Sequence, residues 1–184
     1  DERQIGKVAV LALGYQGGVG AFQTMARGYG VQVSDERAEE IKTAWRKAHP
    51  KITAFWRDLE EAAALALSNP SMAYEAGKVT LLRHGAWLRM VLPSDRSLCY
   101  PAATVKDGVI TYMGTNQFTR KFERIHTYGG KLSENATQAV ARDILAHGLV
   151  LAEEGGVRAG DACPRRNNRG ELHGRRAGAG AARE

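Results

Sequence analysis

The sequence predicts an α+β fold that is mainly helical, with a small antiparallel sheet, a long helix and a loose tail. Apolar residues recur at helical spacing over residues 1–70 and again over 128–154. Between them, over 71–127, the apolar runs are short and partly alternating, and glycine, proline and aspartate separate them, as is typical of hairpins. Residues 155–184 show neither pattern. These four ranges are the expected domains of the chain.

The composition is typical of a soluble globular protein. The 184 residues are 43% hydrophobic and 25% charged, and no apolar run is long enough to span a bilayer. We therefore expect a cytoplasmic protein with no membrane partner. Cys99 and Cys163 are isolated, and no two histidines have helical i, i+4 spacing. The sequence thus predicts no disulfide framework and no metal site.

The net charge of +6 suits a nucleic-acid partner, but its location weakens that argument. Residues 155–184 hold seven arginines and three acidic residues, which gives +4, so the rest of the chain carries only +2. Function must therefore be inferred from particular residues.

Four helices are expected in the first range. Ser34 is a favourable helix cap, and the acidic residues behind it suit the positive end of the helix dipole. Pro50 cannot continue a helix but can begin one. The expected helices span residues 2–13, 21–29, 35–48 and 50–69. Trp45 and Trp56 are expected to bridge the last two, and stacking on nucleic-acid bases is the alternative role.

The second range is expected to form a small antiparallel sheet or hairpins. The candidate strands are the runs 79–81, 87–92, 97–100 and 109–113. Residues 92–98 carry turn chemistry between two of them. Arg96 in that turn is interpreted as an exposed arginine, with a contact to a phosphate backbone as the alternative.

The third range predicts one long helix that ends near Glu154. Ser133 is expected to cap it. The residues expected on its buried side are Leu132, Ala136, Ala139, Val140, Ile144 and Leu145. Asn135, Gln138 and Arg142 share a polar face, where amides can reach base edges along a minor groove. An ordinary amphipathic helix explains the same spacing.

The first helix carries a second candidate site. Arg3, Lys7 and Leu11 lie on one stripe of this helix, and Tyr15 follows at its end. Two cations one turn apart suit a polyphosphate, because arginine is a planar fork and lysine a point charge. On the spacing alone, a solvated basic helix face is the simpler interpretation.

The whole run resembles motif B of the family A DNA polymerases, which belong to the DNA polymerase I type. Residues 7–18, KVAVLALGYQGG, are most similar to the phage and prophage branch. The resemblance implies that this is the fingers helix that closes over the incoming nucleotide. It implies that Arg3 and Lys7 bind the triphosphate, that Leu11 contacts the base and sugar, and that Tyr15 guards the slot for the templating base. Many relatives have an aromatic residue at the position of Leu11, so sugar selectivity is left open.

The run 128–145 resembles the palm helix of the same family, which contacts the primer-template duplex. By register Gln138 matches a glutamine of that helix, and Lys131 matches its arginine with an offset of one position. The resemblance implies DNA contacts by Lys131, Asn135, Gln138 and Arg142. It also implies DNA replication by transfer of nucleotides from deoxynucleoside triphosphates to a primer 3′-OH, in a monomer that uses Mg²⁺.

The tail has a composition unlike the rest of the chain. Residues 155–184 hold seven glycines, seven arginines and six alanines, and we expect them to be disordered. The family has its carboxylate motif C at this point, and codons that encode 156–169 can encode a motif C in a shifted frame. We therefore expect a frameshifted tail, which the coding DNA would test. With motif A expected before Asp1, the chain is interpreted as a fragment that is inactive alone.

Two rivals remain. A non-catalytic, basic helical DNA-binding module predicts that mutation of Lys7 weakens duplex binding uniformly. A purely structural helical domain predicts no effect on nucleotide or DNA. The polymerase hypothesis predicts loss of nucleotide binding with duplex affinity largely kept.

Overall fold

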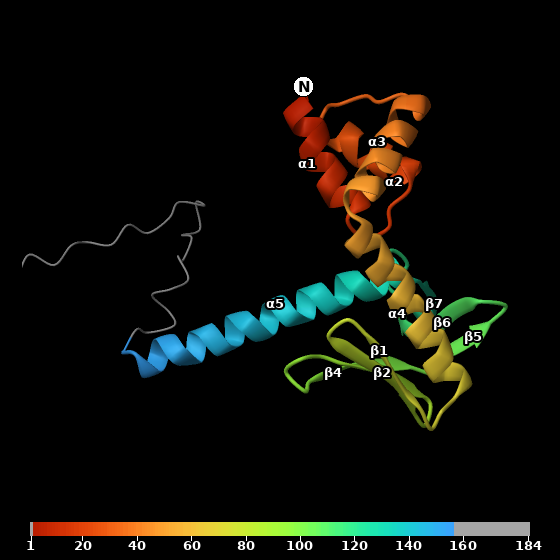
Figure 1. The fold of residues 1–184 in the computed structure, drawn as a ribbon, viewed down its shortest axis with the longest axis vertical. Coiled ribbons are helices and arrows are strands. Elements are labelled where there is room, and N and C mark those ends of the chain that lie inside the picture. Colours follow the sequence, from red (N-terminus) through yellow and green to blue (C-terminus); the bar gives the residue numbers. More distant parts are fainter. Residues whose placement is uncertain (1, 157–184) are drawn as a thin grey trace, which may run out of the picture. The chain divides into compact units, whose positions relative to one another are not determined.

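The computed structural model describes residues 2–156, and the expectations for the tail from residue 157 onward lie outside this range. The chain divides into two compact units, residues 1–141 and 142–184. Each unit is described by itself. The described residues form five helices and seven strands, which confirms the predicted α+β class (Figure 1).

The first three helices of unit 1 share one core. They span Glu2–Leu13 (α1), Val19–Gly28 (α2) and Asp35–Ala48 (α3). Val8, Leu13, Phe22 and Ala38 are fully buried at the centre of this core. The cap predicted for α3 is confirmed, since the Ser34 hydroxyl accepts a 3.2 Å hydrogen bond from the backbone N–H of Arg37. Helical spacing therefore places all three helices, and a side-chain cap marks the start of α3.

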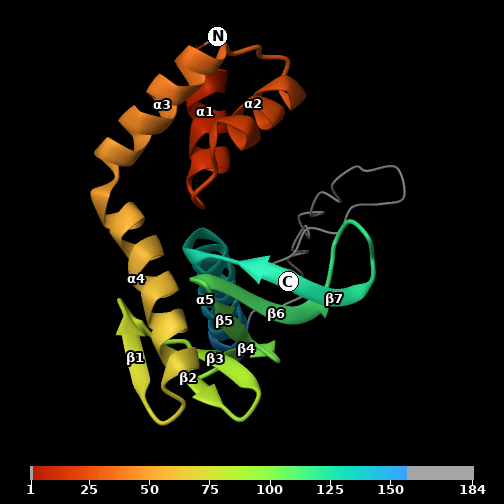
Figure 2. The same ribbon diagram turned by 90° about the vertical axis from the view of Figure 1, so that its right-hand side faces the viewer.

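The fourth helix, α4 (Pro50–Ser68), continues from α3 after a bend at His49 (Figure 2). Pro50 occupies its first turn, as predicted. Trp45 and Trp56 stack with ring centroids 5.9 Å apart and an interplanar angle of 3°. This stack confirms that the two tryptophans bridge α3 and α4.

A four-stranded antiparallel sheet packs against α4 (Figure 2). Its strands follow chain order and span Ala73–Ala76 (β1), Val79–His84 (β2), Trp87–Val91 (β3) and Ser97–Pro101 (β4). Leu81 pairs with Met90 between β2 and β3, and Leu88 pairs with Tyr100 between β3 and β4. All four side chains are buried in a second core with Leu59 of α4.

A second antiparallel sheet has the order β5-β6-β7. Its strands span Thr104–Lys106 (β5), Val109–Thr115 (β6) and Phe122–Thr127 (β7). The runs that become β1, β5 and β7 were not among the predicted strands. The run of β7, FERIHT, is largely polar, and of its side chains only Thr127 is fully buried. Its strand structure therefore comes from pairing with β6, which an apolar pattern cannot reveal.

The fifth helix, α5 (Gly129–Glu154), begins four residues before Ser133. The prediction that Ser133 caps this helix is therefore wrong. Its side chain is buried within the helix, and the first N–H groups of α5 bond instead to side chains of other elements. Leu132, Ala136 and Ala139 are buried, as predicted.

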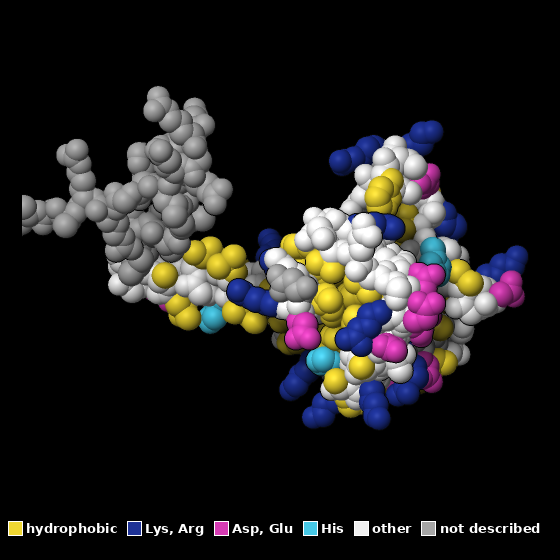
Figure 3. Space-filling model, turned by 90° about the horizontal axis from the view of Figure 1, so that it is seen from above, with side chains coloured by type: hydrophobic (Ala, Val, Ile, Leu, Met, Phe, Trp, Pro, Cys, Tyr) yellow, Lys and Arg dark blue, Asp and Glu magenta, His cyan; other side chains and the backbone are white. Residues whose placement is uncertain are grey.

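The prediction that Ile144 and Leu145 lie on the buried side of this helix is wrong. Both belong to unit 2, and their side chains are 69% and 64% exposed. Hydrophobic side chains are visible on the surface of α5 in its carboxyl-terminal half (Figure 3). Helical spacing identified a continuous apolar face, but spacing cannot say where the packing against that face ends.

The interpretation of Arg96 as an exposed turn arginine is also wrong. Its Nη2 donates a 3.1 Å hydrogen bond to the backbone carbonyl oxygen of Ala139. The side chain thus joins the β3–β4 turn to α5 within unit 1. The turn itself is as predicted, with Asp95 in a left-handed conformation (φ 61°).

Candidate nucleotide and nucleic-acid site

The basic stripe lies on the exposed side of α1. The side chains of Arg3 and Lys7 are exposed, and Leu11 is 48% exposed one turn further on. Lys7 Nζ lies 5.1 Å from the centroid of the Tyr29 ring, a cation–π contact that holds the ammonium at the surface. Within residues 2–156, neither cation forms an ion pair or a side-chain hydrogen bond. Both positive charges are therefore available to an anion.

A groove of about 580 Å³ opens at the carboxyl end of the same helix. Leu11 and Tyr15 line it, but Arg3 and Lys7 do not. Its other walls come from α3, α4, the junction between them, and the first turns of α5, and they include Trp45, His49, Ile52, Phe55, Ser133 and Thr137. The structure thus brings the end of the stripe beside the third predicted range, and the apolar walls suit a planar ring.

Two hydrogen bonds from backbone N–H groups to side-chain oxygens fix the first turn of α5 against this groove. The N–H of Gly130 donates to Gln16 Oε1 at 2.7 Å, across 114 positions of sequence. The N–H of Gly129 donates to Glu60 Oε2 at 3.0 Å. A carboxylate at the positive end of a helix is favourable, so Glu60 and Gln16 together cap α5.

The two glycines at this junction are required by space. A Cβ at Gly129 would collide with the backbone carbonyl of Trp56, and a Cβ at Gly130 would collide with the backbone carbonyl of Tyr15. Gln16 itself has a positive φ of 67°, which a residue other than glycine adopts only when its surroundings hold it there. The groove therefore depends on a close backbone contact between distant segments.

An aromatic stack forms one side of the groove. His49 stacks on Trp45 with ring centroids 4.2 Å apart, and His49 Nδ1 lies 2.8 Å from the carbonyl oxygen of Trp45. Trp56 is 3% exposed, so it cannot offer a face to a nucleic-acid base. Trp45 is half-buried and lines the groove, so of the two tryptophans only Trp45 keeps the alternative stacking role as a prediction.

Two of the predicted DNA-contacting residues of unit 1, Lys131 and Gln138, share the partner Glu134. Lys131 Nζ lies 2.8 Å from Glu134 Oε2, and Gln138 Nε2 donates to Glu134 Oε1 at 3.3 Å. The hydrogen bond to Glu134 raises the pKa of Lys131, so its ammonium stays charged at neutral pH. A carboxylate on this face repels phosphate, although two donors partly neutralise it.

Asn135 has a structural contact in the same unit. Its Nδ2 donates to the hydroxyl oxygen of Tyr100 at 3.1 Å, which joins α5 to β4. Burial raises the pKa of Tyr100 to about 12, and this hydrogen bond partly offsets the rise. The carbonyl oxygen of the amide remains an acceptor for another group.

Arg142, the fourth predicted DNA contact, belongs to unit 2. Its side chain is exposed, and Nη1 lies 3.9 Å from Asp143 Oδ1. A loose surface pair of this kind contributes little to stability, so the guanidinium can exchange its partner for a phosphate.

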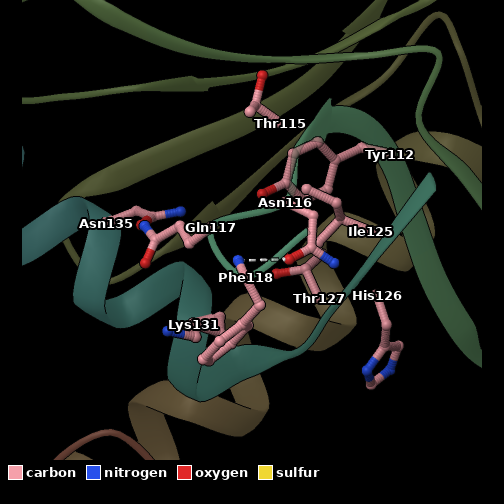
Figure 4. Close-up of a pocket in the computed structure, with 10 residues that line it drawn as sticks. All are labelled: Tyr112, Thr115, Asn116, Gln117, Phe118, Ile125, His126, Thr127, Lys131 and Asn135. Atoms are coloured by element: carbon pink, nitrogen blue, oxygen red, sulfur yellow. Dashed lines mark hydrogen bonds between the residues drawn. The ribbon is translucent and has the colours of Figure 1, made fainter. Parts of the chain in front are cut away.

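A second cavity, of about 260 Å³, lies between the β6–β7 hairpin and α5. Lys131 and Asn135 line it together with Tyr112, Asn116, Gln117 and Phe118 of the hairpin (Figure 4). In that view Gln117 of the hairpin lies beside Asn135 of α5, whereas the His126 ring points away from both. The sequence analysis missed the hairpin residues, although the run from Phe118 to Arg124 interleaves aromatic and basic side chains.

A metal site is not formed by the described residues. Within 2–156, no group of three or more histidine, cysteine, aspartate or glutamate side chains is placed to hold an ion. Over the same range, no helix is both long and apolar enough to cross a membrane.

The chain is similar to a protein named DNA polymerase from Bacillus phage SP02. The two sequences are 38% identical over 162 residues, which are 85% of this chain and 25% of the phage protein. No family model and no solved structure matches the chain. The chain thus spans about a quarter of the length of the phage DNA polymerase that it resembles.

Proposed function

We propose that the chain is the fingers and part of the palm of a phage-type family A DNA polymerase, which extends primers during DNA replication. One observation carries the proposal. The end of the motif B helix and the start of the palm-like helix, 114 positions apart at Gln16 and Gly130, are joined and line one groove. The similarity to a phage DNA polymerase supports the same assignment.

The nucleotide would bind along α1. Arg3 and Lys7 would hold the triphosphate, because both are exposed cations one turn apart that form no ion pair among the described residues. Leu11 would contact the base and sugar, and Tyr15 would lie at the slot for the templating base. Both side chains line the groove, where apolar walls exclude water from a planar ring.

The primer-template would bind along α5. Gln138 and Lys131 are exposed there, and their contacts with Glu134 are short-range surface interactions that a phosphate or base edge can replace. Asn135 would offer its carbonyl oxygen, since its nitrogen is bonded to Tyr100. Arg142 of unit 2 would add a further contact to the DNA backbone.

Mg²⁺ is the cofactor that the family implies, but the described residues do not fit it. They contain no cluster of carboxylates that could hold an ion. The chain's own contribution is therefore binding and orientation of nucleotide and DNA. We propose that the 184-residue chain, as a cytoplasmic monomer, binds both ligands and does not extend a primer.

Nucleotide binding by α1 tests this proposal. Lys7→Ala should lower the affinity for a fluorescent deoxynucleoside triphosphate by about tenfold or more, because a charge-assisted hydrogen bond contributes about 1.5–3 kcal/mol. Lys47→Ala removes an exposed cation from α3 and is the matched control, with unchanged affinity expected. Duplex DNA affinity should stay within about twofold in both variants.

Other outcomes favour the rivals. If Lys7→Ala leaves nucleotide affinity unchanged and weakens duplex binding, the chain is a basic DNA-binding module. If neither ligand responds, the helical region is structural only. Primer extension by the 184-residue chain with Mg²⁺ would contradict its proposed inactivity.

A further inference from the structure

The turn that joins β6 to β7, residues 116–121, exposes an aromatic ring to solvent, and hydrogen bonds within the turn hold its backbone. Phe118 is 95% exposed. Asn116 Oδ1 accepts hydrogen bonds from the backbone N–H groups of Phe118 at 2.8 Å and Thr119 at 3.3 Å. The backbone N–H of Asn116 donates to the carbonyl oxygen of Lys121 at 2.9 Å. The ring is therefore held outward by a network of hydrogen bonds, and we call residues 116–121 the hairpin tip.

The hairpin tip is also positively charged. Arg120 and Lys121 are exposed, and within residues 2–156 their side chains form no hydrogen bond or ion pair. Glu123 is the nearby acidic residue, and its Oε1 accepts from Asn116 Nδ2 at 2.6 Å and from Thr119 Oγ1 at 3.0 Å. Its carboxylate pairs with neither Arg120 nor Lys121, and the two cations outnumber it beside the exposed ring, which favours a polyanion as the ligand.

The adjoining cavity is polar on the side of the hairpin tip. The amides of Asn116 and Gln117 line it with Phe118, and Lys131 of α5 lines its other side (Figure 4). Amide groups can donate to and accept from base edges, and an ammonium can pair with a phosphate. These groups and the ring converge on a volume of about 260 Å³.

We propose that the hairpin tip binds single-stranded DNA, with an unpaired base stacked on Phe118 and the strand's phosphates near Arg120 and Lys121. A base inside a duplex has both faces covered by its neighbours, so an exposed ring favours an unpaired strand. Stacking on aromatic side chains combined with basic residues is the usual chemistry of single-strand binding. The inference rests on the proposed function for its choice of DNA, and its main residues, Phe118, Arg120 and Lys121, are not among the predicted duplex contacts.

Fluorescence anisotropy with the full 184-residue chain tests the inference, using labelled oligothymidylate and a blunt duplex of equal length. Phe118→Ala should lower affinity for oligothymidylate about tenfold and leave duplex affinity unchanged. Phe118→Tyr keeps the ring, so its affinity should stay within about twofold of the parent. Trp87→Ala removes a half-exposed ring on β3, in the other sheet, and is the matched control. Replacing both Arg120 and Lys121 by alanine should reduce the salt dependence of binding by roughly two ion contacts.

Equal oligothymidylate affinities of the parent and Phe118→Ala would overturn the inference, as would a parent chain that does not bind oligothymidylate. A Phe118→Ala variant that loses duplex affinity as much as oligothymidylate affinity would also overturn it. The Lys7→Ala nucleotide measurement separates this failure from failure of the proposed function. Nucleotide binding that depends on Lys7, with no effect of Phe118→Ala, removes only the inference. Phe118-dependent single-strand binding, with no role for Lys7, removes only the proposed function.

Discussion

The groove at the end of α1 and the cavity at the hairpin tip differ in chemistry and in how they are held. Aromatic and aliphatic side chains line most of the groove together with Lys51, and the stripe of Arg3 and Lys7 lies outside it. The cavity combines amides, an exposed ring and Lys131. Backbone contacts at Gly130 hold the groove, whereas a side-chain network around Asn116 holds the hairpin tip. The two sites should therefore respond to different substitutions.

Because of this difference, nucleotide binding and single-stranded DNA binding should be separable by mutation within unit 1. The groove relies on a close approach between segments distant in sequence, so its loss should accompany a loss of folding stability. The hairpin tip is local to one turn, so its loss should leave the fold intact.

Gly130→Ala should be the most damaging substitution. The added Cβ meets the backbone of Tyr15, which cannot move as a flexible side chain can, and we expect a loss of about 3 kcal/mol. For a chain of this size the melting temperature should fall by about 6–12 °C. Circular dichroism during heating measures it. Gly6→Ala, where the added Cβ meets nothing within 4 Å, is the control and should be neutral or slightly stabilising.

A melting temperature for Gly130→Ala within about 2 °C of the parent would contradict the close approach. In that case the groove would not depend on the contact between Gln16 and α5.

The buried hydroxyl of Tyr100 should make stability fall at high pH. Its pKa is about 12 in the folded chain and 10.0 in the unfolded chain, so the unfolded state loses its proton first as pH rises. The stabilisation is complete below pH 10 and is lost between pH 10 and 12, by about 2–3 kcal/mol. Urea unfolding at several pH values measures it, and Tyr100→Phe should flatten that part of the profile.

An unchanged profile in Tyr100→Phe would mean that other groups cause the loss of stability. Burial of Tyr100 would then not raise its pKa as proposed.

Glu134→Gln should strengthen DNA binding by a small amount. The change removes a negative charge that lies 2.8 Å from Lys131 and leaves that ammonium to pair with phosphate. We expect duplex affinity to rise about threefold at low salt, with less effect at high salt. Glu61→Gln, an exposed carboxylate on α4, is the control. Unchanged or weaker duplex binding by Glu134→Gln would remove the DNA-contacting role of this face.

The sequence predicts the fold where local rules decide it. Helical spacing places α1 to α4, and Ser34 and Pro50 mark helix starts by their own chemistry. The start of α5 could not be predicted, because Glu60 and Gln16 from distant segments satisfy its first N–H groups. Strand β7 could not be predicted for a similar reason, since its structure depends on pairing with β6 and not on an apolar run.

The candidate sites divide in the same way. The stripe of Arg3 and Lys7 follows from spacing along one helix, and the structure keeps both cations exposed. The contact of Asn135 with Tyr100 and the cavity at Phe118 join separate elements, so no local pattern contains them. The ion pair of Lys131 and Glu134 has helical i, i+3 spacing, so it could have been predicted from the sequence.

Lysine side-chain NMR of the 184-residue chain tests directly whether nucleotide and single-stranded DNA bind at separate sites. With the ¹³Cε resonances assigned, titration with a deoxynucleoside triphosphate should shift the signal of Lys7 and leave Lys47 unmoved. Titration with oligothymidylate should instead shift Lys121 and Lys131. A triphosphate that shifts Lys121 and Lys131 while Lys7 stays in place would contradict the account.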